Sequence, residues 1–306
     1  MRDLRAYFML FLKGMAMGAA DVVPGVSGGT IAFISGIYAE LLSSIRACTP
    51  LALVCLFRDG PKLFWQRING TFLSVLFSGI LFSIATLARL ITYLLEHQSL
   101  LLWSFFFGLI VASVLFIWRQ LSVKGFGEYV FLALGFCAAL ASAFSPPVLL
   151  EVTSLTVFCA GMLAICAMIL PGISGSFILL LLGMYSVILE AVTAGNYSLL
   201  LVFTTGCVSG LMLFSRLLSW LLSRFQGFTL ALLTGFLAGS LVMVWPWREA
   251  GVAAGKGHAS ALHLLTPGQY TQVVADAQLV AALGLMILGF MMVLSLEYIG
   301  GRRGRS

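Results

Sequence analysis

The chain has 306 residues, of which 61% are hydrophobic and 9% are charged, and its mean hydropathy is +1.08. This composition excludes a soluble globular protein and indicates a polytopic membrane protein without room for a sizeable soluble domain. The net charge of +6 does not indicate a nucleic-acid partner, because the basic residues stand singly or in short groups between apolar runs, as topogenic charges do.

Ten apolar segments follow one another along the chain, and each is long enough to form a membrane helix or part of one. They cover about residues 6–20, 30–45, 71–95, 100–118, 128–145, 152–170, 176–194, 199–222, 228–247 and 277–299. A basic loop at 46–70 separates the second segment from the third, and we expect it to be cytoplasmic and to carry an interfacial helix.

A Pro/Gly-rich stretch at 21–30 interrupts the first apolar region, and it recurs 147 positions later, at 171–176. The matched residues are Pro24 with Pro171, Gly25 with Gly172, Ser27 with Ser174, Gly28 with Gly175, Gly36 with Gly183 and Tyr38 with Tyr185. Hydropathy alone would not select these glycines, prolines and serines. The stretch is therefore half of an internal repeat.

The repeat continues at an offset of 127, because the first half carries a longer loop. Gly79 matches Gly206, Arg89 matches Arg216, Gly108 matches Gly235 and Trp118 matches Trp245, while Gly135 pairs weakly with Gly284. The sequence thus predicts two five-segment repeats, at 1–150 and 151–306. An odd number of segments inverts the second repeat, and this topology places most of the 17 lysines and arginines in the cytoplasm, with both termini. The loop at 248–276 is then extracytoplasmic.

The first arm of the motif, about residues 9–20, would be roughly 18 Å long as a helix, which is too short to cross the bilayer core. We therefore expect a re-entrant helical hairpin bent at Pro24 and Gly25, and a second hairpin bent at Pro171 and Gly172. Such breaks are tolerated at membrane depth where they are buried or line a wet path. The predicted fold is an all-α polytopic membrane protein with two inverted-topology repeats, each containing a re-entrant helical hairpin and about three transmembrane helices.

The two bends are candidate anion sites, because glycine allows close backbone approach and the following helices would present free N–H groups and serine or threonine hydroxyls. The candidate phosphate-binding residues are Gly25, Ser27, Gly28, Gly29 and Thr30 in the first bend, and Gly172, Ser174, Gly175 and Ser176 in the second. The alternative is that these small residues only allow close helix packing. Packing, however, does not require a proline and a serine repeated in register.

Arg89 and Arg216 stand near the ends of matched long helices and are further candidates for phosphate contact. The alternative is that their side chains extend to the membrane surface. Candidates for coupling or gating are Lys13, Asp21, Glu40, Glu190 and His97. Lys13 and Asp21 could form a pair, and Glu40 and Glu190 are either interfacial acids or proton carriers.

The first motif resembles the signature of the bacterial undecaprenyl-phosphate (polyprenyl-phosphate) translocase family. The residues that carry this resemblance are Lys13, Gly14, Gly18, Asp21, the run 24–30 and the run 36–38. The resemblance implies a flippase that returns the lipid carrier of cell-wall precursors from the outer to the cytoplasmic leaflet of the inner membrane. It implies undecaprenyl phosphate or a related lipid as the ligand. The second motif departs from the first in having Phe177 where Thr30 stands, which questions equal roles for the two bends.

Two rival functions use the same stretch. Gly25–Gly28 has the GxSG form found around the serine of rhomboid-like intramembrane proteases, but such chemistry needs a histidine base and no predicted span contains a histidine. A transporter or channel for a small anion would use the same bends. We expect no enzyme activity and no cofactor. We also expect no metal site, since the six cysteines form no CxxC pair and are predicted to be small buried hydrophobic residues.

Overall fold

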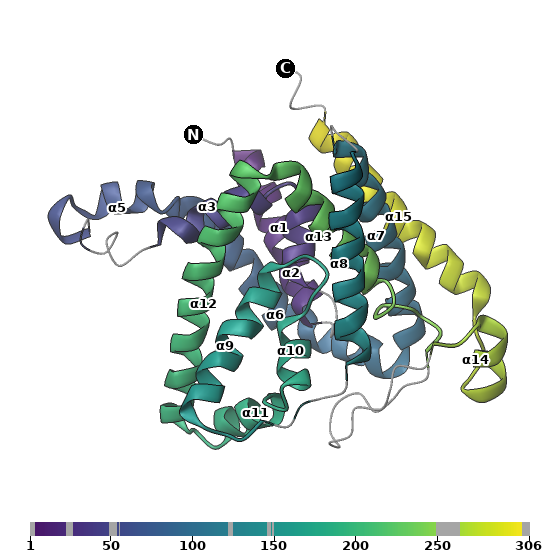
Figure 1. The fold of residues 1–306 in the computed structure, drawn as a ribbon. Helices are drawn as coiled ribbons and strands as arrows, with labels where there is room; N and C mark the ends of the chain where they lie inside the picture. Colours follow the sequence, from purple (N-terminus) through teal and green to yellow (C-terminus); the bar gives the residue numbers. More distant parts are fainter. Residues whose placement is uncertain are drawn as a thin grey trace. The chain divides into compact units, whose positions relative to one another are not determined.

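The computed structural model describes residues 4–22, 27–48, 54, 56–121, 125–145, 148, 150–248 and 264–301. Within these ranges the chain is helical and forms no strand beyond an isolated bridge between Arg248 and Leu264 (Figure 1). The all-α prediction is confirmed for this part of the chain. The inverted orientation of the two halves stays a prediction.

The chain folds into two compact units, Met1–Ile91 with Leu149–Gln226 and Thr92–Val148 with Gly227–Ser306. The first unit contains α1 (Leu4–Val22), α2 (Gly28–Ile34), α3 (Tyr38–Ala47), α5 (Pro61–Arg67), most of α6 (Gly70–His97), α9 (Ser154–Ile169), α10 (Gly175–Leu181), α11 (Tyr185–Thr193) and α12 (Tyr197–Arg224). The second unit contains α7 (Ser99–Gln120), α8 (Phe126–Phe144), α13 (Gln226–Ser240), α14 (Pro267–Val273) and α15 (Leu279–Gly301). Each unit takes helices from both halves of the sequence.

The helix boundaries recur at the offsets of the sequence identities. The bounds of α2 and α10 are 147 positions apart at both ends, and those of α6 and α12 are 127 positions apart at both ends. Related sequence in the two halves therefore forms related helices.

The chain breaks after α2 and after α10, at glycines within apolar segments that the sequence predicts to be continuous. Gly36 and Gly183 have φ of 74° and 67°, a left-handed conformation that favours glycine, and their N–H groups close the helix ends by donating to Phe33 and Leu180. The chain then turns by 118° into α3 and by 106° into α11. The predicted continuous segments at 30–45 and 176–194 are therefore each two short helices.

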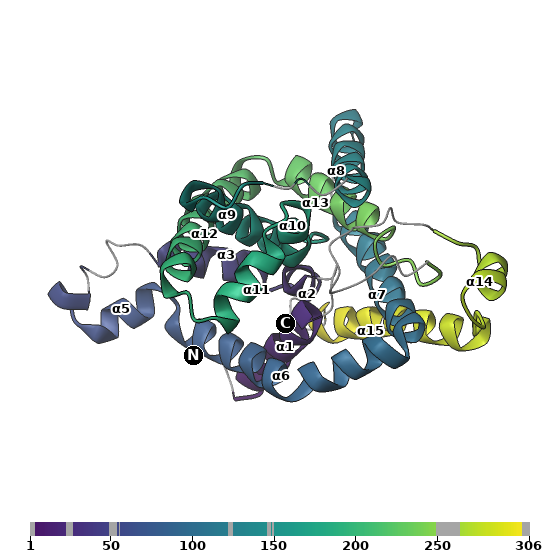
Figure 2. The ribbon, with the colours of Figure 1, turned by 90° about the horizontal axis from the view of Figure 1, so that it is seen from below.

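Paired glycines bring helix backbones into contact within the first unit, where α9 and α12 run side by side (Figures 1 and 2). A Cβ on Gly79 of α6 would overlap the carbonyl oxygen of Phe11 in α1, and a Cβ on Gly206 of α12 would overlap that of Phe158 in α9. These glycine positions are 127 apart, and the carbonyls are 147 apart. The repeat therefore extends to individual atomic contacts.

The second unit corrects one detail of the repeat. A Cβ on Gly135 of α8 would overlap the carbonyl of Leu232 in α13, and a Cβ on Gly289 of α15 would overlap the carbonyl of Phe105 in α7. Gly284 has no atom within 4 Å of such a Cβ. Gly289, and not Gly284, is thus the counterpart of Gly135.

Four described helices are long and apolar enough to cross a membrane, or up to six if each bent pair counts as one span. The chain is therefore a multi-pass membrane protein. The predicted short first arm is wrong, because α1 has 19 residues, or about 28 Å of helix, and begins well before residue 9. The basic loop contains α5, whose Leu63 and Trp65 are exposed. Cys137 and Cys159 are exposed on apolar helices, so they are not buried as predicted.

Candidate functional site

The first bend leads into α2, whose N-terminal amide groups are all bonded inside the protein. The amide of Gly28 donates to Asp21 Oδ1 at 2.7 Å, and the amide of Gly29 donates to the N-cap hydroxyl of Ser27 at 3.1 Å. The amide of Thr30 donates to the carbonyl of Ser27 at 2.9 Å. The expectation that these amides are free for an anion is not met in this conformation, because Asp21 and Ser27 occupy them. Pro24 and Gly25 lie outside the described residues.

Side chains of the first bend and of α3 cap the C-terminus of α9. The last carbonyls of a helix receive no hydrogen bond from within the helix, so other groups must donate to them. Ser27 Oγ donates to the carbonyl of Met168 at 2.8 Å, and the hydroxyl of Tyr38 donates to that of Ile169 at 2.9 Å. Any Cβ on Gly29 would lie 2.6 Å from the Met168 oxygen, so the start of α2 packs directly on the end of α9.

The second bend donates one hydrogen bond to a side chain that follows the first bend directly, at the start of α2. The amide of Gly172 donates to Thr30 Oγ1 at 2.9 Å, and Gly172 has φ of 89°, which favours glycine. Thr30 is 1% exposed. Three hydrogen bonds therefore join stretches 131 to 142 positions apart, and the two bends touch within the first unit.

The second bend does not make the equivalent contacts. Ser174 is the N-cap of α10 but forms no cap hydrogen bond, and its hydroxyl instead pairs with that of Ser176 at 2.8 Å. The amides of residues 175–177 have no acceptor within the described ranges. A Cβ on Gly175 would lie 2.6 Å from the carbonyl of Ala164, so this bend also packs closely on α9.

The matched tyrosines differ in the same way. Tyr38 is 4% exposed, and its hydroxyl is hydrogen-bonded to α9. Tyr185 is 38% exposed, and its hydroxyl has no hydrogen bond within the part of the chain that the structure describes. The sequence is symmetric at these positions, and the contacts are not.

Arg89 and Arg216 lie at equivalent positions of α6 and α12, with exposed side chains. Neither forms a hydrogen bond or ion pair with the described residues, so the structure does not join them to the bends. Exposed arginine side chains on apolar helices are compatible both with phosphate contact and with extension to the membrane surface.

Three of the other ionisable candidates, Lys13, Glu40 and His97, make contacts with neighbouring residues. Lys13 Nζ donates to the carbonyl of Ser35 at 2.6 Å, next to the break after α2. Glu40 Oε1 accepts from Asn69 Nδ2 at 3.0 Å, which ties α3 to the start of α6. Glu190 is exposed on α11. His97 ends α6, where it stacks on Tyr93 with ring centroids 4.3 Å apart.

Comparison with known proteins adds a family to this geometry. Residues 17–261 match a family model described as VCA0040-like, undecaprenyl phosphate translocase-like. The chain belongs to this family. The resemblance of the first motif is thereby confirmed, and the matched range includes both bends.

Two curated relatives carry the same name. The chain is 47% identical, over 95% of its length and 96% of the relative, to a polyprenyl-phosphate transporter of Vibrio cholerae serotype O1. It is 33% identical, over 77% of its length and 85% of the relative, to a polyprenyl-phosphate transporter of Staphylococcus aureus. No solved structure matches the chain.

Proposed function

We propose that this protein is a transporter that moves undecaprenyl phosphate, or a related polyprenyl phosphate, from the outer to the cytoplasmic leaflet of the bacterial inner membrane. The observation that carries the proposal is the near full-length similarity to a polyprenyl-phosphate transporter, at 47% identity. The direct contact of two polar bends inside an apolar helical unit supports it.

The chemistry of such a lipid suits this arrangement. The phosphate cannot enter hydrocarbon without compensating donors, whereas the polyprenyl chain never needs to leave the membrane. The protein must only supply a polar route for the head group. Hydroxyls of the two bends and the amides at the start of α10 provide its middle, and Arg89 and Arg216 provide a cation towards each face if the repeats are inverted.

The unequal contacts of the two bends suggest how the route alternates. In this conformation, Ser27 and Tyr38 hold the end of α9, while the hydroxyls of Ser174 and Ser176 bond to each other. The repeat places the ends of α1 and α9 at matched positions. In the opposite state, Ser174 and Tyr185 hold the carbonyls of Asp21 and Val22 as Ser27 and Tyr38 now hold α9, so the two repeats exchange conformations. Lys13, Asp21, Glu40, Glu190 and His97 stay candidates for coupling or gating.

The proposal does not include enzyme chemistry. Ser27 Oγ donates to one backbone carbonyl and accepts from one backbone amide, an arrangement that caps a helix and does not activate a nucleophile.

Reconstituted liposomes test the function. A fluorescent polyprenyl phosphate is placed in one leaflet, and its accessibility to an added reductant is followed over time. We expect exchange between leaflets to be much faster than in protein-free liposomes and insensitive to soluble phosphate. A rate equal to that of empty liposomes contradicts the proposal. Uptake of soluble phosphate without lipid exchange favours the small-anion transporter instead.

A further inference from the structure

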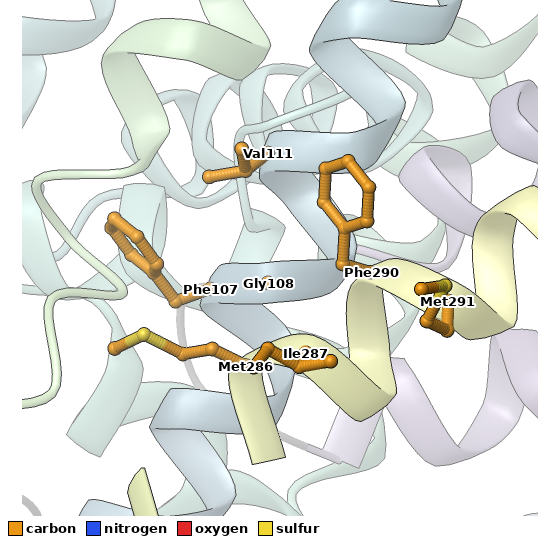
Figure 3. A pocket seen from close by; sticks show the side chains of 7 residues that line it. All are labelled: Phe107, Gly108, Val111, Met286, Ile287, Phe290 and Met291. Carbon is orange, nitrogen blue, oxygen red and sulfur yellow. The ribbon is translucent and has the colours of Figure 1, made fainter. Parts of the chain in front are cut away.

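An apolar groove runs between α7 and α15 in the second unit (Figure 3). It has a volume of about 340 Å³ and is lined by Phe107, Gly108, Val111, Met286, Ile287, Phe290 and Met291. Figure 3 shows Phe107 and Phe290 on either side of Gly108. A Cβ on Gly108 would overlap the carbonyl of Met286, so the two backbones touch at the base of the groove. The helix crossing therefore fixes the position of the groove.

One end of the groove continues into a rigid aromatic cluster. The ring of Phe107 packs edge-on against Trp245, with centroids 5.4 Å apart, and Trp245 packs against Trp247 at 5.5 Å. Both indoles are fixed by hydrogen bonds, from Trp245 Nε1 to the carbonyl of Leu265 at 2.9 Å and from Trp247 Nε1 to that of Ala277 at 3.0 Å.

Arg248 lies beside this cluster. Its guanidinium carbon is 4.0 Å from the centre of the Trp103 ring, and its Nη1 donates to the carbonyl of Met243. Trp103 is one helical turn before Phe107 on α7, so the ring under the cation lies roughly 6 Å along the helix face from a residue that lines the groove. Burial lowers the pKa of Arg248 to about 10, which leaves it positively charged at neutral pH.

The guanidinium has donors to spare. The guanidinium carries five N–H groups, and within the described ranges its one hydrogen bond is to the carbonyl of Met243. No described carboxylate forms an ion pair with it; its neighbour Glu249 lies outside the described residues. A half-buried cation on an aromatic face, with its planar fork unfilled, suits an oxyanion such as a phosphate.

We propose that the second unit holds a binding site for polyprenyl phosphate, in which Arg248 binds the phosphate and the groove between α7 and α15 holds the adjoining part of the prenyl chain. This site deepens the proposed function and rests on it. A single lipid chain fits a groove bounded by two touching backbones, whereas the paired chains of a phospholipid do not. Methionine and phenylalanine side chains also suit the double bonds and methyl groups of a prenyl chain.

The phosphate half of the site is tested by affinity. The full-length protein in nanodiscs is titrated with undecaprenyl phosphate and with undecaprenol, which has the same chain and no phosphate. We expect Arg248→Ala to weaken binding of the phosphate about tenfold, as for loss of a charge-assisted hydrogen bond, and to leave binding of the alcohol unchanged. Arg248→Lys keeps the charge without the fork and should fall between wild type and Arg248→Ala.

The chain half is tested by a matched pair of substitutions. Met291 lines the groove and is 55% exposed, while the adjacent Met292 is 45% exposed and does not line it. Met291→Trp should weaken binding of both ligands, and Met292→Trp should not. In the wild-type protein, a photoreactive group on the first prenyl units should label residues 286–291, which tests the site without any substitution.

The outcomes separate this site from the proposed function. If wild type binds and moves the lipid but Arg248→Ala and Met291→Trp bind as wild type does, the site is overturned and the function stands. Equal displacement of the ligand by phosphatidylglycerol also overturns the site, because any anionic lipid would then occupy it. If wild type binds no polyprenyl phosphate, the proposed function itself fails.

Discussion

A hydroxyl on one helix and a carbonyl at the end of another form the most informative contact of the first unit. The sequence shows that Tyr38 and Tyr185 repeat, but it does not show that Tyr38 donates to Ile169, because a backbone carbonyl has no signature in the sequence. For the same reason the sequence marks Ser27 and Thr30 as candidates but does not identify Met168 and Gly172 as their hydrogen-bond partners.

Tyr38→Phe tests this contact. The substitution removes one hydroxyl and leaves the partly buried carbonyl of Ile169 without a donor, so we expect the free energy of unfolding to fall by about 1 kcal/mol. Tyr185→Phe is the matched control, since that hydroxyl has no partner among the described residues, and it should leave stability unchanged. Thermal unfolding of the purified protein in detergent measures both, and equal effects of the two variants would argue against the asymmetry.

At the scale of helices, sequence patterns located most apolar segments but not the turns inside them. The breaks after Ile34 and Leu181 depend on single glycines with positive φ, which an apolar run with good helical periodicity conceals. The pairing of Gly135 with Gly284 is wrong because the sequence alone does not fix the register of the repeat. Leucine-rich helices align in several registers, and contact with a neighbouring backbone decides which glycine is equivalent.

Two alanine substitutions in α15 test the corrected register. Gly289→Ala places a methyl group against the carbonyl of Phe105, and we expect the free energy of unfolding to fall by about 1–3 kcal/mol. Gly284→Ala has open space, so the better helix propensity of alanine should raise stability by about 0.5–1 kcal/mol. Chemical or thermal unfolding of each variant gives the sign, and destabilisation by Gly284→Ala would contradict the assignment.

Crosslinking with a short bifunctional thiol reagent, which spans the length of a tyrosine side chain, tests the exchange of conformations between the bends. In a cysteine-free background, Tyr38→Cys with Ile169→Cys reports the contact seen here, and Tyr185→Cys with Val22→Cys reports its counterpart. We expect both pairs to crosslink in membranes, and conditions that raise the yield of one to lower that of the other. A second pair that never crosslinks would leave the first conformation without its proposed opposite.

For the whole molecule, the sequence identified a multi-pass transporter and its family, and the orientation of the repeats in the membrane stays a prediction. Lysine and arginine counts favour inversion, but the bilayer that would fix it is external to the chain. Arg89 and Arg216 belong to this scale, because their exposed side chains have a role only if they face the path of a lipid head group.

Substitution of these arginines separates transport from folding. Arg89→Ala and Arg216→Ala should each slow leaflet exchange of polyprenyl phosphate at least several-fold, while the unfolding temperature stays the same because both side chains are exposed. Arg58→Ala is the control, since Arg58 is exposed and makes a surface ion pair with Asp59 at 4.0 Å. Normal transport by both α6 and α12 variants would remove the arginines from the route.

The capping of α9 by the first bend also has a consequence for biogenesis. The ribosome makes the donors Ser27 and Tyr38 more than a hundred residues before their acceptors. In an early half-chain in the membrane, these hydroxyls therefore lack their acceptors on α9. When the end of α9 is made, its donors are already present. The two halves complete each other only after the second has been inserted, so a newly made first half remains an unfinished partner rather than an independent domain.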